Sequence, residues 1–233
     1  MARRQIRDIP APSATSFVPS TTSLRTLGAA ARDCHGCDLY RHATQVVFGT
    51  GPATARVMFV GEQPGDQEDR QGLPFVGPAG ALLDKALEDA GIARKQIYLT
   101  NAVKHFKWEP RGKRRIHKKP RISEIAACRP WLEAETRVVK PLILVCLGAT
   151  AAQSVMGSSF KLTQHRGKLL VLPPASAKSG GTLKAGRVLA TIHPSAVLRA
   201  IDTEGRRAAY ESLVADLKVV GEALRDPHGF TSD

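Results

Sequence analysis

The residues best suited to chemistry lie in the stretch 61–80, GEQPGDQEDRQGLPFVGPAG, which directly follows an apolar run at 57–60. Carboxylate and amide side chains, Glu62 and Gln63 among them, stand beside one aromatic ring, that of Phe75. A strand that enters a glycine-rich loop and then a helix points backbone N–H groups at one spot, which is how open α/β sheets build binding sites. The alternative is a polar surface loop with an ordinary core phenylalanine, because loop motifs also occur by chance.

A second candidate is His117, which lies in the basic segment 104–121, KHFKWEPRGKRRIHKKPR. This segment has many lysines and arginines and a single acid, Glu109, and two prolines and Gly112 interrupt it, so we expect a cationic loop. The flanking cations disfavour the protonated imidazole, which predicts a neutral, nucleophilic ring at physiological pH. Phosphate neutralisation by such a loop would make binding salt-sensitive. The alternative is a solvated basic face in which His117 has no role.

The four cysteines, Cys34, Cys37, Cys128 and Cys146, are candidate metal ligands. A zinc ribbon would need a second short pair, which the chain lacks. Thiolates at scattered spacing suit an iron–sulfur cluster as well as zinc. The alternative is that Cys128 packs in a helix and Cys146 in a core strand.

Alternating strands and helices must position these residues. Apolar runs predict strands at 57–60, 96–103, 141–147, 168–172 and 187–192, and helical periodicity predicts helices at 23–31, 81–90, 122–135, 149–156 and 206–224. This order predicts an α/β fold with a mostly parallel sheet that helices cover on both faces. Ligands bind at the carboxyl ends of such strands, so we expect the Glu62 loop, Asn101, the segment after Val103 and His193 along one rim.

The net charge of the chain indicates the kind of molecule that it binds. The chain of 233 residues has a net charge of +13 and a pI near 10.0, which favour a polyanion such as nucleic acid over a merely basic surface. No apolar run has the length of a membrane span and no secretory signal is recognisable, so we expect a cytoplasmic protein without a membrane partner. We expect one domain, residues 23–225, between tails at 1–22 and 226–233, the first of them mobile.

Several motifs occur in the order of a known family. GEQPGDQED, PFVGPAG, LTNAVKH, the four-cysteine pattern and HPSAVL resemble the iron–sulfur uracil-DNA glycosylases, family four of that superfamily, from about Cys34 to Leu217. Two features differ from the ordinary hydrolases: the pair Glu62-Gln63 and the insertion KRRIHKKP. Both resemble the X-type subgroup, the cross-linking glycosylases, in which an inserted histidine becomes covalently joined to the DNA sugar.

The resemblance implies a three-layer α/β/α sandwich around a mostly parallel four-stranded sheet, and a [4Fe–4S] cluster on the four cysteines. It implies a monomer that acts on uracil-containing DNA, single-stranded in preference to duplex. A flipped uracil would enter a pocket at the rim of the sheet. The substrate contacts it implies are Gly61, Pro64, Gly65, Asp66, Phe75, Asn101, Arg115 and Ser195.

The same resemblance implies catalytic roles for four residues. His193 would hydrogen-bond the charge that develops on uracil, and His117 would capture the sugar cation. Glu62 and Gln63 would orient the His117 ring. Two alternatives stay open: a conventional glycosylase in which water captures the sugar, and a non-catalytic iron–sulfur protein that only binds DNA.

Overall fold

The computed structural model describes residues 13–172 and 183–226. Its centre is a five-stranded sheet in the order β2-β1-β5-β7-β6. The strands are β1 (Val57–Gly61), β2 (Ile97–Asn101), β5 (Ile143–Leu147), β6 (Leu169–Val171) and β7 (Arg187–Thr191). The first four in the order are parallel, and β6 pairs antiparallel with β7. The mostly parallel sheet is therefore confirmed, with one short edge strand more than the four strands expected.

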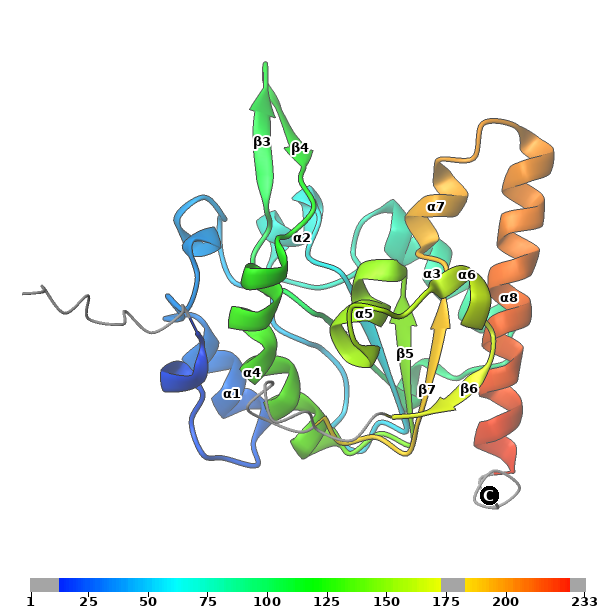
Figure 1. Cartoon of the computed structure of the whole chain (residues 1–233), viewed down its shortest axis with the longest axis horizontal. Helices are drawn as coiled ribbons and strands as arrows, with labels where there is room; N and C mark the ends of the chain where they lie inside the picture. Colours follow the sequence, from blue (N-terminus) through cyan, green and yellow to red (C-terminus); the bar gives the residue numbers. More distant parts are fainter. Residues whose placement is uncertain (1–12, 173–182, 227–233) are drawn as a thin grey trace, which may run out of the picture.

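Helices cover both faces of this sheet, which gives the three layers expected (Figure 1). One face packs on α3 (Pro78–Asp89), α7 (Pro194–Leu198) and α8 (Thr203–Arg225). The other face packs on α4 (Ile122–Val139) and α5 (Ala149–Met156), and α1 (Leu24–Ala31) lies against α4. Side chains alternate between the two faces: Phe59 of β1 lies in one core cluster and Met58 in the other.

The basic segment differs from the cationic loop that the sequence predicts. It forms an antiparallel hairpin of β3 (Trp108–Arg111) and β4 (Arg114–His117), which projects from the body of the molecule (Figure 1). Gly112 has a φ of 58°, the left-handed conformation that two-residue hairpin turns favour. The glycine turn and the pairing of β3 with β4 therefore give this segment regular structure despite its high positive charge. The remaining elements are η1 (Thr15–Phe17), η2 (Asp38–Arg41), η3 (Arg94–Gln96), α2 (Asp66–Gln71) and α6 (Leu162–His165).

Residues 13–22 also differ from prediction, because they pack on the domain although we expected them in a mobile tail. Ala14 is buried, and its N–H donates to the carbonyl of Ala127 in α4 at 2.8 Å. The rest of the predicted tails, residues 1–12 and 227–233, lies outside the described residues. Within the residues that the structure describes, no helix combines the length and apolar character needed to cross a membrane.

Candidate active site

Predicted site residues from four separate segments meet in one cavity of about 690 Å³, where β1, β2, β5 and β7 end. Most of the predicted catalytic and substrate-binding residues line it: Glu62, Gln63, Gly65, Phe75, Asn101, His117, His193 and Ser195. Four predicted residues do not: Gly61, Pro64, Asp66 and Arg115. The cavity lies at the carboxyl ends of parallel strands, as expected of an open α/β sheet.

The floor of the cavity depends on Gly61 having no side chain. Gly61 pairs with Asn101 across β1 and β2, and a Cβ at Gly61 would lie 2.2 Å from Asn101 Oδ1 and 2.9 Å from Phe75 Cζ. Phe75 has a φ of 58°, a rare conformation for a residue other than glycine, and its ring stacks on that of His193 with centroids 6.3 Å apart. Asn101 and Phe75 are therefore held in fixed positions by close packing.

His193 presents a neutral ring with a defined proton. Its Nδ1 accepts the backbone N–H of Ser195 at 3.1 Å, so the proton of the neutral ring is on Nε2. Burial, helped by the nearby Arg199 and His117, lowers the pKa of His193 to about 4. At neutral pH the residue can therefore act as an Nε2–H hydrogen-bond donor.

His117, the last residue of β4, reaches the same cavity from the base of the hairpin. Its Nε2 lies 3.4 Å from Glu62 Oε1, and its side chain is half exposed. Burial lowers the pKa of His117 below its usual value of 6.5; Glu62 opposes this shift and Arg199 reinforces it. The neutral ring agrees with the sequence prediction, but its causes are burial and Arg199, where we had expected the neighbouring hairpin cations.

Gln63 fixes the base of the hairpin. Its Nε2 donates to the carbonyls of Lys107 at 3.2 Å and Lys118 at 3.1 Å, and its Oε1 accepts the N–H of Lys107 at 3.0 Å. These two lysines face each other where the hairpin leaves the body, since the N–H of Lys118 donates to the carbonyl of Lys107. Gln63 thus positions the element that carries His117, whereas Glu62 contacts the ring.

Arg115 binds the side of the hairpin to α2. It forms ion pairs with Asp66 and with Asp69, the latter at 2.6 Å. The guanidinium also lies over the rings of Phe106 and Trp108, 5.5 Å and 5.4 Å from their centroids. Since these contacts leave the side chain only 14% exposed, Arg115 holds the hairpin against α2.

Among the other residues that line the cavity, Glu68 and Arg199 are polar and were not assigned a role in the predicted site. Glu68 accepts the N–H groups of Gly65 at 3.1 Å and Gly77 at 2.8 Å and so closes the loop between them. A glutamate three residues after a helix cap is a known capping pattern, which could have identified it. Arg199 donates to Ser195 Oγ at 3.0 Å and lines the cavity near both histidines, and no local pattern marks it.

The model of the uracil DNA glycosylase superfamily matches residues 48–218. The chain belongs to this superfamily. It is 37% identical over 183 residues to a protein of Thermotoga maritima named type-4 uracil-DNA glycosylase, a match that covers 78% of this chain and 86% of the relative. Proteins with the same name from Sulfurisphaera tokodaii and Archaeoglobus fulgidus are 35% and 34% identical, over 86% and 81% of this chain and 84% and 87% of theirs.

Three of the four cysteines of this superfamily member share one region between α1 and α4: Cys34, Cys37 and Cys128. Two of their sulfurs accept hydrogen bonds from fixed donors, Cys34 Sγ from Trp131 Nε1 at 3.2 Å and Cys128 Sγ from the N–H of Lys104 at 3.3 Å. In the described residues, no three His, Cys, Asp or Glu side chains are arranged to hold a single metal ion. Sulfur ligands with hydrogen bonds of this kind are typical of iron–sulfur sites, so the donor chemistry fits a cluster.

Cys146 lies apart from the other three cysteines. It belongs to β5, and its fully buried side chain packs with Leu144 and Val60 in the core cluster on the α5 face of the sheet. Burial raises the pKa of both Cys146 and Cys128, but only Cys128 also interacts electrostatically with Cys37 and Cys34. Cys146 thus has the position of a core thiol, which was the alternative for this residue.

His105 is a further candidate metal ligand near the three grouped cysteines. It follows Lys104, whose N–H contacts Cys128 Sγ, and it is close enough to His35, between Cys34 and Cys37, for the two rings to repel when charged. Its side chain is buried, which lowers the pKa of the imidazole to about 4 and keeps it neutral, the form that binds metal. Spacing rules based on cysteine could not identify it.

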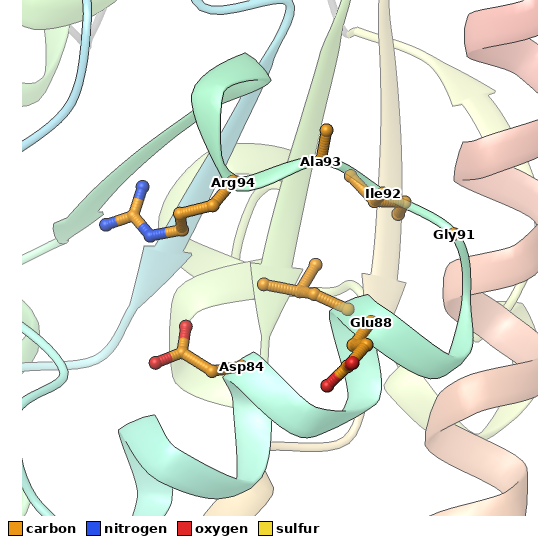
Figure 2. Close-up of a pocket in the computed structure, with 7 residues that line it drawn as sticks. Asp84, Glu88, Gly91, Ile92, Ala93 and Arg94 are labelled. Carbon is orange, nitrogen blue, oxygen red and sulfur yellow. The ribbon is translucent and has the colours of Figure 1, made fainter.

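Another hollow, of about 480 Å³, lies where α3 ends (Figure 2). Asp84, Glu88 and Arg94 surround its apolar floor of Leu87 and Ile92. The chain runs from this point through η3 into the start of β2, so the hollow is near the amino end of this strand, whereas the candidate active site is at the carboxyl ends of the parallel strands. None of the predicted site residues lines it.

Proposed function

We propose that this protein removes uracil from DNA and that His117 then forms a covalent bond to C1′ of the freed deoxyribose. The superfamily and the names of the relatives support uracil excision. The contact between His117 Nε2 and Glu62 Oε1, at the cavity that also contains Asn101 and His193, carries the proposal of covalent capture.

In the first step the bond between C1′ and uracil N1 breaks, and its electron pair leaves with the uracil. Asn101 has an amide that both donates and accepts, which suits the uracil edge, and Phe75 offers a ring for stacking. His193 would donate Nε2–H to the carbonyl oxygen on which negative charge develops. Donors fixed in advance toward such charge are the main source of acceleration in many enzymes.

In the second step the lone pair on the unprotonated nitrogen of the neutral His117 ring forms a bond to the cationic C1′, and the proton of the other ring nitrogen, now part of an imidazolium, passes to the Glu62 carboxylate. The adduct is therefore a neutral N-alkyl imidazole beside a protonated Glu62, which later returns its proton to solvent. The uracil anion gains a proton from solvent on release. Each requirement on the ring, neutrality and a nearby base, is met by a group within the cavity.

The direct test is to mix the protein with a uracil-containing oligonucleotide and to run a denaturing gel. The proposal predicts a protein–DNA band of reduced mobility that survives denaturation and is absent with the matching thymine oligonucleotide. Free abasic DNA without this band would refute covalent capture and leave a turnover glycosylase. An intact glycosidic bond would refute both.

His117→Ala is the informative variant in the same gel. It should lose the retarded band, because no other neutral nucleophile among the described residues is paired with Glu62. Release of uracil should persist, since Asn101 and His193 are unchanged. A retarded band of normal intensity in this variant would contradict the role of His117.

For the cofactor, we propose an iron–sulfur cluster held by Cys34, Cys37 and Cys128, with His105 in the fourth position in place of Cys146. A bound cluster would tie together the segments around α1 and α4. Purified protein should be brown and contain iron; a colourless preparation with zinc would refute the proposal. Cys146→Ser should retain its iron, whereas His105→Ala should lose iron or alter the visible spectrum. The opposite pattern would restore Cys146 as a ligand.

A further inference from the structure

A buried ion pair lies beneath the base-binding side of the cavity. Lys104 Nζ is 2.5 Å from Glu135 Oε2, and the two side chains are 1% and 0% exposed. Removing two charges from water is costly, and apolar residues of similar size are often at least as stable in such places. Stability alone is therefore a weak explanation for this pair.

The ammonium of Lys104 uses all three of its donors. It donates to Glu135, to Thr100 Oγ1 at 2.6 Å and to the backbone carbonyl of Asn101 at 2.8 Å. The Lys104 backbone reaches the cysteine region, because its N–H donates to Cys128 Sγ at 3.3 Å. One residue thus contacts both the peptide of Asn101 and a cysteine.

Glu135 anchors the pair in α4. Its Oε1 accepts from Tyr98 Oη at 3.0 Å and from the N–H of Gly49 at 3.1 Å. Thr100 donates to the same oxygen at 2.9 Å. The carboxylate is therefore fixed in place by three donors in addition to Lys104, and two of these donors, Tyr98 and Thr100, belong to β2.

The end of β2 is joined to the catalytic loop. The N–H groups of Ala102 and Val103 donate to the carbonyls of Gly61 at 2.9 Å and Glu62 at 3.0 Å. The carbonyl of Asn101 and the N–H of Ala102 belong to the same peptide group, and Lys104 donates to this carbonyl from the protein interior. The side chain of Asn101 lines the cavity.

From this geometry we propose that Lys104, held by Glu135, is a positioning residue for uracil recognition: it fixes the Asn101 peptide so that the amide side chain meets the uracil edge. This inference rests on the proposed function, in which Asn101 contacts uracil. Because displacement of a contacting group by about 1 Å can lower a rate on the order of 100-fold, the effect of losing this restraint should be measurable.

The test variant is the double substitution Lys104→Met with Glu135→Gln. Lys104→Met alone would leave a buried charge and could unfold the protein, whereas the pair of substitutions removes both charges. The amide oxygen that Glu135→Gln introduces could still accept from Gly49 and Tyr98. The matched control is Arg129→Met with Glu133→Gln. It neutralises a second ion pair of α4, in which Arg129 Nε lies 2.8 Å from Glu133 Oε1, and neither residue lines the cavity.

Three quantities are measured in each protein: hydrogen–deuterium exchange of the Ala102 and Val103 amides, binding of free uracil by calorimetry, and affinity for DNA without uracil. The double variant should exchange faster at these amides and bind uracil roughly 10-fold more weakly or worse, with its affinity for uracil-free DNA unchanged. The control should match the wild type in all three.

Unchanged exchange and unchanged uracil binding in the double variant would overturn the inference. An equal loss of affinity for uracil-free DNA would also overturn it, because that result indicates general loss of structure. The wild type separates this inference from the proposed function: a wild type that releases no uracil refutes the function, whereas an active wild type beside an unaffected double variant refutes only the role of Lys104.

Discussion

Asn101 and His117 reach the same cavity from two different kinds of structure. Asn101 is 2% exposed at the carboxyl end of β2, a parallel strand of the main sheet, and close packing against Gly61 fixes it. His117 is half exposed in the last position of β4, at the base of a two-stranded hairpin that projects from the body (Figure 1). The hairpin is held chiefly by polar contacts, those of Gln63 at its base and Arg115 at its side.

This difference separates the two proposed steps. In the proposal, base removal depends on the rim of the main sheet, whereas capture depends on the separate β3–β4 hairpin, which can be loosened without disturbing the core. Substitutions at the rim should therefore lower release of uracil and formation of the adduct together. Substitutions at the hairpin should lower the ratio of adduct to free abasic DNA and leave uracil release intact.

The largest effect is expected at the rim, for His193→Ala. Loss of one fixed donor to a developing anion should lower the single-turnover rate of uracil release roughly 100- to 1000-fold. The ratio of adduct to abasic product should stay as in the wild type, because His117 is unchanged. Both are measured in one quenched time course. His165→Ala, outside the cavity, is the control, and a changed ratio in His193→Ala would break the proposed separation.

Arg115→Met tests the side contact of the hairpin. Asp69, whose side chain is 0% exposed, would lose its guanidinium partner, which should lower the free energy of unfolding by about 2 kcal/mol. The adduct ratio should fall as well, because the hairpin is freed from α2. Denaturant unfolding and the gel assay measure the two effects. Arg166→Met, which breaks the 2.7 Å pair with Asp216, should lower stability and leave the ratio unchanged.

Gln63→Leu tests the base of the hairpin. It removes three hydrogen bonds to Lys107 and Lys118, so His117 should meet the sugar less often and the adduct ratio should fall about 10-fold. Uracil release should change little. Gln153→Leu removes an amide that donates to the Phe160 carbonyl elsewhere and serves as the control. Equal losses of release and adduct in Gln63→Leu would indicate that the hairpin and the rim act as one unit.

A smaller effect is expected in the pH dependence. The pKa of His117 lies below its usual value of 6.5, so the neutral ring, and with it adduct formation, should persist below that pH and then decline as the pH falls further. Arg199→Gln removes one of the charges that lower this pKa. The decline should therefore begin at a higher pH in the variant, measured in low salt at saturating DNA. If adduct formation declines at the same pH in the variant as in the wild type, solvent screens the charge of Arg199 too well for it to lower the pKa of His117.

The sequence predicted the sheet because its strands are apolar runs between helical periodicities, and it predicted the rim because parallel strands end together. Asn101 and His193 follow from that rule. The hairpin could not be predicted in this way, since β3 and β4 are short, charged and free of apolar alternation. Helix α2, DQEDRQ, likewise has no apolar face that a periodicity could reveal.

Contacts between segments that are distant in the sequence could not be predicted for a different reason. Gln63 hydrogen-bonds to Lys107 and Lys118, which follow it by 44 and 55 positions in the sequence. Arg115 hydrogen-bonds to Asp69, which precedes it by 46 positions, so the roles of Gln63 and Arg115 depend on tertiary geometry. The same holds for the cysteines. Spacing treats Cys146 as equal to the other three, whereas β5 places it in the sheet core with Leu144.

The most direct test of the central claim is to digest the protein–DNA complex and to locate the attachment site by tandem mass spectrometry. A deoxyribose remnant on the imidazole of His117 is the predicted result. A remnant on Lys118, Lys119 or any other residue, or no modified peptide at all, would contradict the account.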